Sequence, residues 1–453
     1  MRDRPGDSPT RAASNNLPTS APQPSKKRGV FYGWYVVASA FCANFAYSEQ
    51  FSSTYGVFIY HIGMEMGWGR TVLAGVKTVG RAGEVLAAPF VGGLVDRYGA
   101  RWLMIIGGVF FAAGMILCST VGEIWQLYLY LGVLMPLAGM GVGGLVATIA
   151  VSNWFVVKRG RAVGITAMGM SFGAMVAPLA ISAVIAVEGW RVGWIVMGVA
   201  AFLLTLPAAF LVRRRPEDMG LLPDGAEPFE SSPTSDATAR PSRRQELLAA
   251  DVVWKRRDVL RTPLLWVMSF AWGFAQFAQT STNVHAVPFL QDLGYPIVLA
   301  ATAVTVRSAA TFVGNPIWGY VAERMPVKRA ATLQFVLASA GVGMWLLPPS
   351  HLTIFAGLVL FGIGASGGQV LSELAWATYY GRVSLGTVRG IAYPIQTAFA
   401  AAGPLGVGLL YDLSGSYQLP FAVMIVGNTI AMALIQLIRP PNRPATARVT
   451  AEA

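Results

Sequence analysis

Three charged residues stand close together in an otherwise apolar stretch of the chain, residues 76–89 (VKTVGRAGEVLAAP). Lys77, Arg81 and Glu84 are spaced i, i+4 and i+7, so in a helix they share one face. An arginine binds a carboxylate through two parallel hydrogen bonds, and a glutamate beside it can accept a proton and release the arginine. The spacing predicts an anion site coupled to proton movement, with the alternative that Arg81 and Glu84 only neutralise each other.

A second arginine, Arg307, lies in another long apolar stretch, where no acid stands within one helical turn of it. Counted from the ends of their stretches, Arg81 and Arg307 both lie roughly 15 Å into a bilayer core of ~30 Å. A charge at that depth is costly unless it faces protein or a water-filled cavity. We therefore predict that the two guanidinium groups face one aqueous chamber and bind an anion there.

Weaker candidates for the same site are polar residues in neighbouring apolar stretches. Lys77 lies nearer the outer side, where it can instead extend its amine toward water. His285 has the alternative role of a structural histidine that is hydrogen-bonded near the outer edge. The remaining candidates are predicted only from their positions and polar side chains: Glu49, Tyr55, Asn283, Tyr393 and Gln396.

The elements that must position these residues are membrane-spanning helices. The 453-residue chain is 54% hydrophobic and 12% charged, whereas soluble domains carry about 25% charged residues. Twelve stretches are long and apolar enough to span a bilayer. They are residues 33–60, 71–95, 102–121, 125–152, 162–186, 191–212, 263–289, 297–321, 330–347, 352–378, 390–411 and 418–438. The sequence thus predicts an all-α polytopic membrane protein with twelve transmembrane helices.

The positive charges are divided unequally between the two sides of these stretches. Of the 34 Lys and Arg residues, 29 fall in the tails and in the connections on their side, two in the opposite connections and three within spans. This division follows the positive-inside rule and predicts both termini in the cytoplasm, in a plasma (inner) membrane. No basic and aromatic residues interleave as a nucleic-acid surface would require, so we expect no nucleic-acid partner.

The two halves of the chain repeat each other. At an offset of 227 residues, PFVGGLVDRYGAR (89–101) matches PIWGYVAERMPVK (316–328), with Asp96 matching Glu323 and Arg97 matching Arg324. This duplication predicts two pseudo-symmetric six-helix bundles, residues 31–212 and 263–439. A linker, 213–262, would join them, and residues 1–30 and 440–453 would form a disordered tail and a second tail, both cytoplasmic.

The segment Gly92–Arg101 (GGLVDRYGAR) resembles the signature loop between the second and third helices of the major facilitator superfamily. Finer features resemble its monocarboxylate and oxalate:formate antiporter branch: FYGWYVV, GWGR, NWFVVKRGRAVGI, RRRPEDMGLLPDG and YYGRVSLGTVRG. The resemblance implies a secondary transporter of small organic anions that works by alternating access, with proton coupling or exchange. Asn315 stands where such relatives often place an arginine, and 390–411 holds no lysine, which disfavours a dicarboxylate.

The same resemblance implies a conformational role for charged residues at the inner ends of the spans. Asp96, Arg97 and Arg101, with Glu323 and Arg324 of the second copy, are expected to hold one conformation closed. Glu373, near the inner end of its span, is expected to pair with Arg389 or with the Glu323–Arg324 loop rather than with substrate.

Other classes of protein have less support. No nucleotide-binding, zinc-protease or serine-hydrolase motif is present, and His61, His285 and His351 stand far apart, so we expect neither an enzyme nor a metal or other cofactor. A drug or hydrophobic-compound efflux carrier of the same fold is the main alternative, and a non-transporting membrane sensor is a lesser one. We expect a monomer in contact with membrane lipid.

Overall fold

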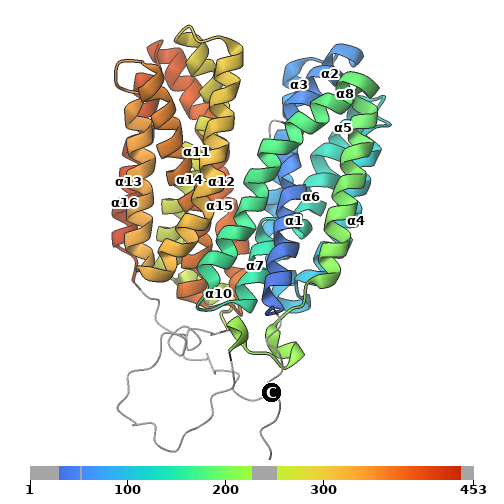
Figure 1. Ribbon diagram of the computed structural model, residues 1–453, viewed down its shortest axis with the longest axis vertical. Coiled ribbons are helices and arrows are strands. Elements are labelled where there is room, and N and C mark those ends of the chain that lie inside the picture. Colours follow the sequence, from blue (N-terminus) through green and yellow to red (C-terminus); the bar gives the residue numbers. More distant parts are fainter. Residues whose placement is uncertain (1–29, 52–53, 227–252, 440–453) are drawn as a thin grey trace, which may run out of the picture.

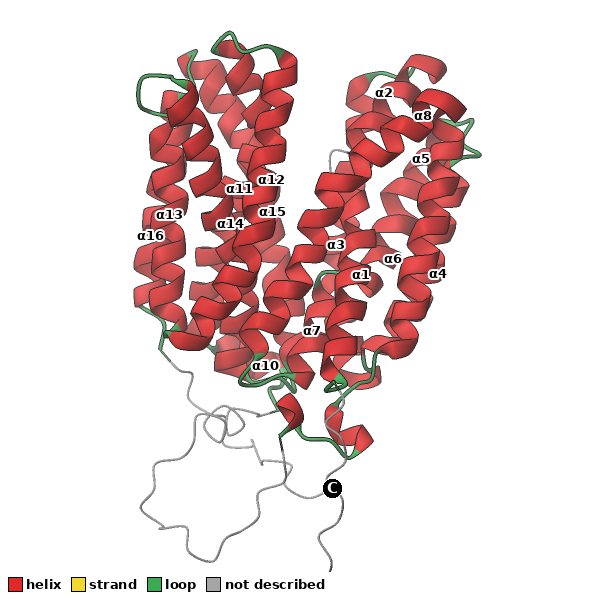
Figure 2. Ribbon diagram, viewed as in Figure 1, coloured by secondary structure: helices red, strands yellow, loops and turns green. Residues whose placement is uncertain are grey.

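The computed structural model describes residues 30–51, 54–226 and 253–439, and within these residues it contains helices and no strand (Figure 2). Residues 1–29 and 440–453 of the predicted tails, and residues 227–252 of the predicted linker, lie outside the described residues.

The N-terminal half supplies six of the spans. Its first span is divided into α1 and α2, and its fourth runs from α5 to α7. Its fifth and sixth spans lie in α8, where Gly189 (φ 82°) reverses the chain in a conformation that residues with a Cβ rarely adopt. The elements are α1 Gly33–Phe51, α2 Thr54–Met66, α3 Arg70–Tyr98, α4 Ala100–Cys118, α5 Ile124–Leu127, η1 Tyr128–Leu134, α6 Met135–Val142, α7 Leu145–Trp154 and α8 Arg159–Leu211.

The C-terminal half supplies the other six spans, one helix each. Two short 3-10 helices, η2 Pro216–Met219 and η3 Pro223–Gly225, precede it together with α10 Arg256–Arg261. The spanning helices are α11 Pro263–Asp292, α12 Ile297–Arg324, α13 Val327–Met344, α14 His351–Tyr380, α15 Leu385–Ser414 and α16 Gln418–Gln436. The described residues therefore confirm the predicted twelve helices in two bundles.

Polarity separates the helices into two groups. Five helical segments of the described residues are long and apolar enough to cross a membrane by composition: α4, Ile124–Trp154, α8, α14 and α16. The long helices α3, α11, α12 and α15 are not among them, and of these α3, α11 and α15 contribute polar residues to a cavity between the halves. Helices that line a polar chamber need fewer lipid-compatible residues, but the cavity is not the whole reason, because α14 is one of the five apolar segments and still contributes Glu373 to the lining.

The two bundles approach each other closely at one end and diverge toward the other (Figure 1). The close end carries η2, η3 and α10, and we refer to it as the linker end. Two helix crossings between the halves lie there, α3 with α15 and α8 with α12. A Cβ on Gly92 would lie 2.1 Å from the backbone oxygen of Gly386, and one on Gly160 equally close to that of Gly319, so these crossings require glycine.

Candidate functional site

A cavity of about 280 Å³ lies between the two halves. Both halves contribute polar side chains to its walls, which fits the position expected for a site at the interface of two repeats. The principal polar residues of its lining are Asn44, Tyr47, Arg81 and Thr148 from the N-terminal half, and Gln276, Gln279, Asn283, Glu373, Arg389, Tyr393 and Gln396 from the C-terminal half.

Arg81 and Glu84 of α3 form an ion pair in the wall of this cavity. The Arg81 Nη1 lies 3.0 Å from the Glu84 Oε2, at the i, i+3 spacing, and Tyr393 of α15 donates a hydrogen bond of 3.4 Å to the same oxygen. Glu84 is fully buried, whereas 39% of the Arg81 side chain is exposed. The guanidinium group therefore faces the cavity while its carboxylate partner lies behind it.

A second ion pair, between Glu373 of α14 and Arg389 of α15, also lines the cavity. The Arg389 Nη1 donates a 3.2 Å hydrogen bond to the Gln396 Oε1. Within the described residues the Arg389 Nε, the Glu373 Oε2 and the Gln396 Nε2 are buried without a hydrogen-bond partner. This group therefore retains two donors and one acceptor beside the cavity.

Arg389 is the charged cavity residue that the sequence placed elsewhere, because its span was predicted to begin at residue 390; the polar lining residues Asn44, Tyr47 and Thr148 were not predicted either. The helix α15 begins at Leu385, so Arg389 lies inside it and is only 6% exposed, whereas the sequence predicts a connecting loop there. Ser384, the residue before the helix, is a common type at helix starts and could have indicated the earlier boundary. The sequence predicted that Glu373 pairs either with Arg389 or with the Glu323–Arg324 loop, and in the structure it pairs with Arg389.

Arg307 is not among the residues that line the cavity. Its side chain is buried, with 9% of the residue exposed, and its Nε has no hydrogen-bond partner within the described residues. It lies where α12 approaches α14, since its backbone oxygen is 2.7 Å from where a Cβ on Gly362 would stand. The structure thus does not bring Arg81 and Arg307 together around one chamber, and a substrate role for Arg307 stays a prediction.

Lys77 and Tyr55 contact each other rather than the cavity. The Lys77 Nζ lies 4.1 Å from the centroid of the Tyr55 ring, and Tyr55 donates a 2.8 Å hydrogen bond to the Leu73 backbone oxygen.

His285 is likewise absent from the cavity lining. Its Nδ1 lies 3.2 Å from the Tyr417 hydroxyl and its Nε2 lies 3.0 Å from the Pro404 oxygen. These contacts agree with the second role predicted for His285, that of a structural histidine held by hydrogen bonds. Asn283, Tyr393 and Gln396 do line the cavity, and the side chain of Glu49 lies outside the described residues.

Two carboxylates join the halves at the linker end, and we call these contacts the latches. Asp96 at the end of α3 accepts hydrogen bonds from the Gly386 N (3.0 Å), the Thr387 N (2.7 Å) and the Thr387 hydroxyl (2.8 Å). These donors stand at the start of α15, where the helix dipole favours a negative charge.

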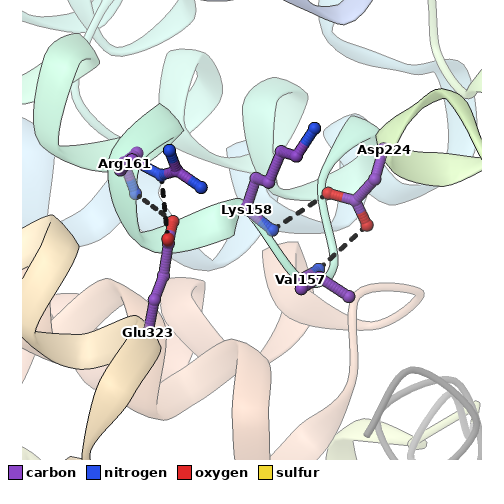
Figure 3. Close-up of polar contacts among 5 residues, drawn as sticks. All are labelled: Val157, Lys158, Arg161, Asp224 and Glu323. Atoms are coloured by element: carbon purple, nitrogen blue, oxygen red, sulfur yellow. Dashed lines mark hydrogen bonds and ion pairs between the residues drawn. The ribbon is translucent and has the colours of Figure 1, made fainter. Parts of the chain in front are cut away.

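The second latch is its counterpart at the 227-residue offset. Glu323 of α12 accepts hydrogen bonds from the Arg161 backbone N (2.9 Å) and Nε (2.8 Å) at the start of α8 (Figure 3). The predicted Arg324 instead lies 3.7 Å from the centroid of the Tyr320 ring. Together the latches join the two halves at the linker end. The residues described here contain no group of three His, Cys, Asp or Glu side chains that could hold a metal ion.

A family comparison agrees with this architecture. The sequence profile of the Major Facilitator Superfamily matches residues 37–305 and 279–453, so the chain belongs to that superfamily. It is accordingly an integral, multi-pass membrane transporter and not an enzyme.

Three transporters are each about a quarter identical to this chain. An oxalate:formate antiporter of Oxalobacter formigenes is 25% identical, over 81% of this chain and 83% of that protein. Monocarboxylate transporter 4 of Gallus gallus is 26% identical, over 93% of this chain and 87% of that protein. An MFS-type transporter of Gibberella moniliformis is 25% identical, over 90% of this chain and 91% of that protein.

A solved structure shares the fold. The proton:xylose symporter bound to 6-bromo-6-deoxy-D-glucose superposes with a TM-score of 0.68 at 11% identity, covering 91% of this chain and 97% of that one. At that identity the likeness extends to the fold alone.

Proposed function

We propose that this protein transports small organic anions of the monocarboxylate kind by alternating access, with proton coupling or exchange. The observation that carries the proposal is the half-exposed Arg81 guanidinium, aimed into a polar cavity between the halves while Glu84 is buried behind it. A guanidinium group pairs planar acids through two hydrogen bonds. The names of the oxalate:formate and monocarboxylate relatives support the same class of substrate.

In the conformation described, the second cation at the cavity is Arg389. We therefore propose that a bound carboxylate contacts Arg81 and, through the unpaired donors beside the cavity, Arg389 and Gln396. A cavity of about 280 Å³ suits a small substrate, because it lies near the lower end of the usual ligand-pocket range of roughly 300 to 1,000 Å³. Arg307 is proposed as an anion contact only after movement of α12.

Proton coupling is proposed to act through Glu84. When Glu84 accepts a proton it loses its attraction for Arg81, and the guanidinium group then gains hydrogen-bonding capacity for a substrate carboxylate. Release of the two latches would open the linker end, because both join the halves there. Orientation with this end in the cytoplasm follows from the positive-inside bias.

The test is counterflow of short mono- and dicarboxylates in proteoliposomes that hold the purified protein. Arg81→Ala is expected to reduce carboxylate counterflow at least tenfold, because a charge-assisted bidentate contact contributes roughly 1.5 to 3 kcal/mol. Arg191→Ala, which removes a cation at the far outer end, is the matched control and should transport normally. Equal counterflow by Arg81→Ala and by the parent protein would reject the anion site.

Glu84→Gln separates the coupling from the binding. Counterflow, which needs no net proton movement, should persist, whereas uptake driven by a pH gradient should fall. If both persist, Glu84 serves only as the structural partner of Arg81. Transport of hydrophobic cations without any carboxylate transport would support the drug-efflux alternative instead.

A further inference from the structure

An apolar groove of about 670 Å³ runs along the outside of the N-terminal half, and it shares no lining residue with the central cavity. Its walls come from α3 and α4, and its floor comes from η1 and α6. Characteristic members of its lining are Leu94, Tyr98, Trp102, Ile106, Val133 and Leu137. More than half of Tyr98, Trp102 and Ile106 is exposed, so the groove opens to the surroundings of the protein.

Since the chain is an integral membrane protein, this groove faces the bilayer. Its lining is almost wholly aliphatic or aromatic. Such a lining can pack against an acyl chain but has almost no hydrogen-bonding groups for a polar ligand. Tyr98 and Trp102 stand at its linker end, which is the arrangement of an interfacial aromatic belt at headgroup level.

Two cations flank the groove at that same end. The Arg97 Cζ lies 5.2 Å from the centroid of the Tyr98 ring. The Arg101 Cζ lies between two rings, 6.0 Å from the centroid of Trp102 in the groove and 5.7 Å from that of Phe210 in α8. Among the described residues neither arginine forms an ion pair with an acid. The adjacent Asp96 is bound to α15 in its latch and does not neutralise them.

The second repeat has two cations at the equivalent positions, and one of them is bound by the protein. At the 227-residue offset, Arg324 stacks on the Tyr320 ring at 3.7 Å, and the Lys328 Nζ donates a 3.2 Å hydrogen bond to the Gln436 oxygen. The Lys328 amine is therefore bound by a backbone oxygen, whereas Arg324, like Arg97, contacts a neighbouring tyrosine ring.

We infer that the groove binds an anionic phospholipid of the leaflet at the linker end. Its phosphate lies between Arg97 and Arg101, and one acyl chain occupies the groove toward Ile106 and Val133. Charge complementarity selects an anionic over a zwitterionic lipid, because a zwitterionic headgroup brings its own cation to the two arginines. The site lies beside the Asp96 latch, on the same helix end.

The experiment is native mass spectrometry of the purified full-length protein, titrated with phosphatidylglycerol or with phosphatidylcholine of the same acyl chains. The parent protein should retain several-fold more phosphatidylglycerol. Arg97→Gln with Arg101→Gln should abolish that preference, and the matched pair Arg324→Gln with Lys328→Gln should keep it. Ile106→Trp with Val133→Trp, which fills the groove and leaves both arginines, should reduce binding of both lipids.

Three results would overturn the inference. Equal retention of the two lipids by the parent protein would remove the headgroup preference. An equal loss in the Arg324/Lys328 control would show attraction by overall charge only. A dimer mass that disappears when the groove is filled would assign the groove to a second copy of the chain. Because lipid binding is measured without transport, none of these results depends on the proposed function.

Discussion

Arg81 is suited to bind an anion because it is more exposed than Glu84, its partner in the ion pair. A buried carboxylate and a half-exposed guanidinium 3.0 Å apart leave the positive group oriented toward the cavity. The i, i+3 spacing provides the pair, and the Tyr393 hydroxyl of the other half donates to the same carboxylate. The site therefore depends on both halves, and a movement between them would change the environment of Glu84.

The Glu373–Arg389 pair supports a prediction about stability. Both side chains are almost fully buried, at 13% and 8% exposure. Removing one partner leaves an uncompensated buried charge, so Glu373→Leu and Arg389→Met should each lower stability by about 3 kcal/mol or more. The double variant should be closer to the parent protein.

Thermal unfolding of the four proteins in one detergent checks this prediction. Additive losses in the double variant would show that the two charges do not compensate each other.

A pH-dependent contact lies at the opposite end of the molecule from the linker. Glu65 of α2 accepts hydrogen bonds from Arg191 and from the Trp190 indole, both near the middle of α8. These bonds, that of Arg191 first, lower the pKa of Glu65 below its ordinary value of 4.5. A carboxyl group with a lowered folded-state pKa contributes stability above its unfolded pKa and loses it as the pH falls through the folded value.

The expected result is a small stability advantage of the parent protein over Glu65→Gln that is constant above about pH 5 and disappears below pH 4. The contact is exposed, so the advantage is small at every pH. Melting temperatures of the two proteins measured from pH 3 to 7 check it. An advantage that grows on acidification would contradict the assignment.

At the scale of elements, the start of α8 is ordered by a residue from a distant segment. Asp224 of η3 accepts hydrogen bonds from the backbone N–H groups of Val157 (2.9 Å) and Lys158 (3.0 Å) (Figure 3). It also accepts one from the Val156 N–H (3.1 Å). Asp224 itself adopts φ 62°, a conformation that Asp tolerates better than most residues. It thus satisfies amides that stand immediately before the helix that carries Arg161 of the second latch.

Asp224→Ala should free those three amides. Loss of a capping carboxylate costs about 1 to 2 kcal/mol, so their hydrogen exchange should accelerate about tenfold. Exchange mass spectrometry of the peptide covering residues 156–158 checks the prediction. Asp218→Ala, an exposed acid in η2, is the control, and unchanged exchange in Asp224→Ala would deny the capping role.

At the scale of the whole molecule, the two latches and the two glycine crossings are related by the internal repeat. Asp96 with Gly92, and Glu323 with Gly319, occupy the same positions in α3 and α12. Each set holds the first turn of a helix of the other half. A repeat that was duplicated in sequence has therefore produced two equivalent contacts, and both join the halves at the linker end.

Asp96→Asn and Glu323→Gln should each shift the protein away from the conformation described. The charge-assisted hydrogen bonds of each latch are worth roughly 1.5 to 3 kcal/mol, or about tenfold or more in population. Spin labels at the exposed positions Val187 and Leu347, at the diverging end, should move closer together as the linker end opens. The native Cys42 and Cys118 must first be replaced.

The double variant should shift the distance distribution further than either single variant. A distribution identical to that of the parent protein in all three variants would show that the latches do not stabilise this state. Arg329→Gln, which changes a charge at the same end outside both latches, is the control.

Much of the architecture was predictable because it depends on local composition. Apolar stretches of bilayer length indicate spans wherever they occur, and the repeated PFVGGLVDRYGAR segment indicated two bundles. The Arg81–Glu84 pair was predictable because i, i+3 neighbours meet in any helix. A boundary error of a few residues was enough to misplace Arg389, since one missed helical turn moved it from the cavity wall to a loop.

The sequence by itself determined how many spans there are, how far along its span each residue lies, and which residues of one helix meet each other. Only the tertiary structure decided that Arg81 and Arg389 line the cavity, that Arg307 does not, and that His285 is bound by Tyr417 and Pro404. The physical reason is that depth follows from the rise per residue along one helix, whereas the direction in which a side chain faces its neighbours depends on how separate helices pack.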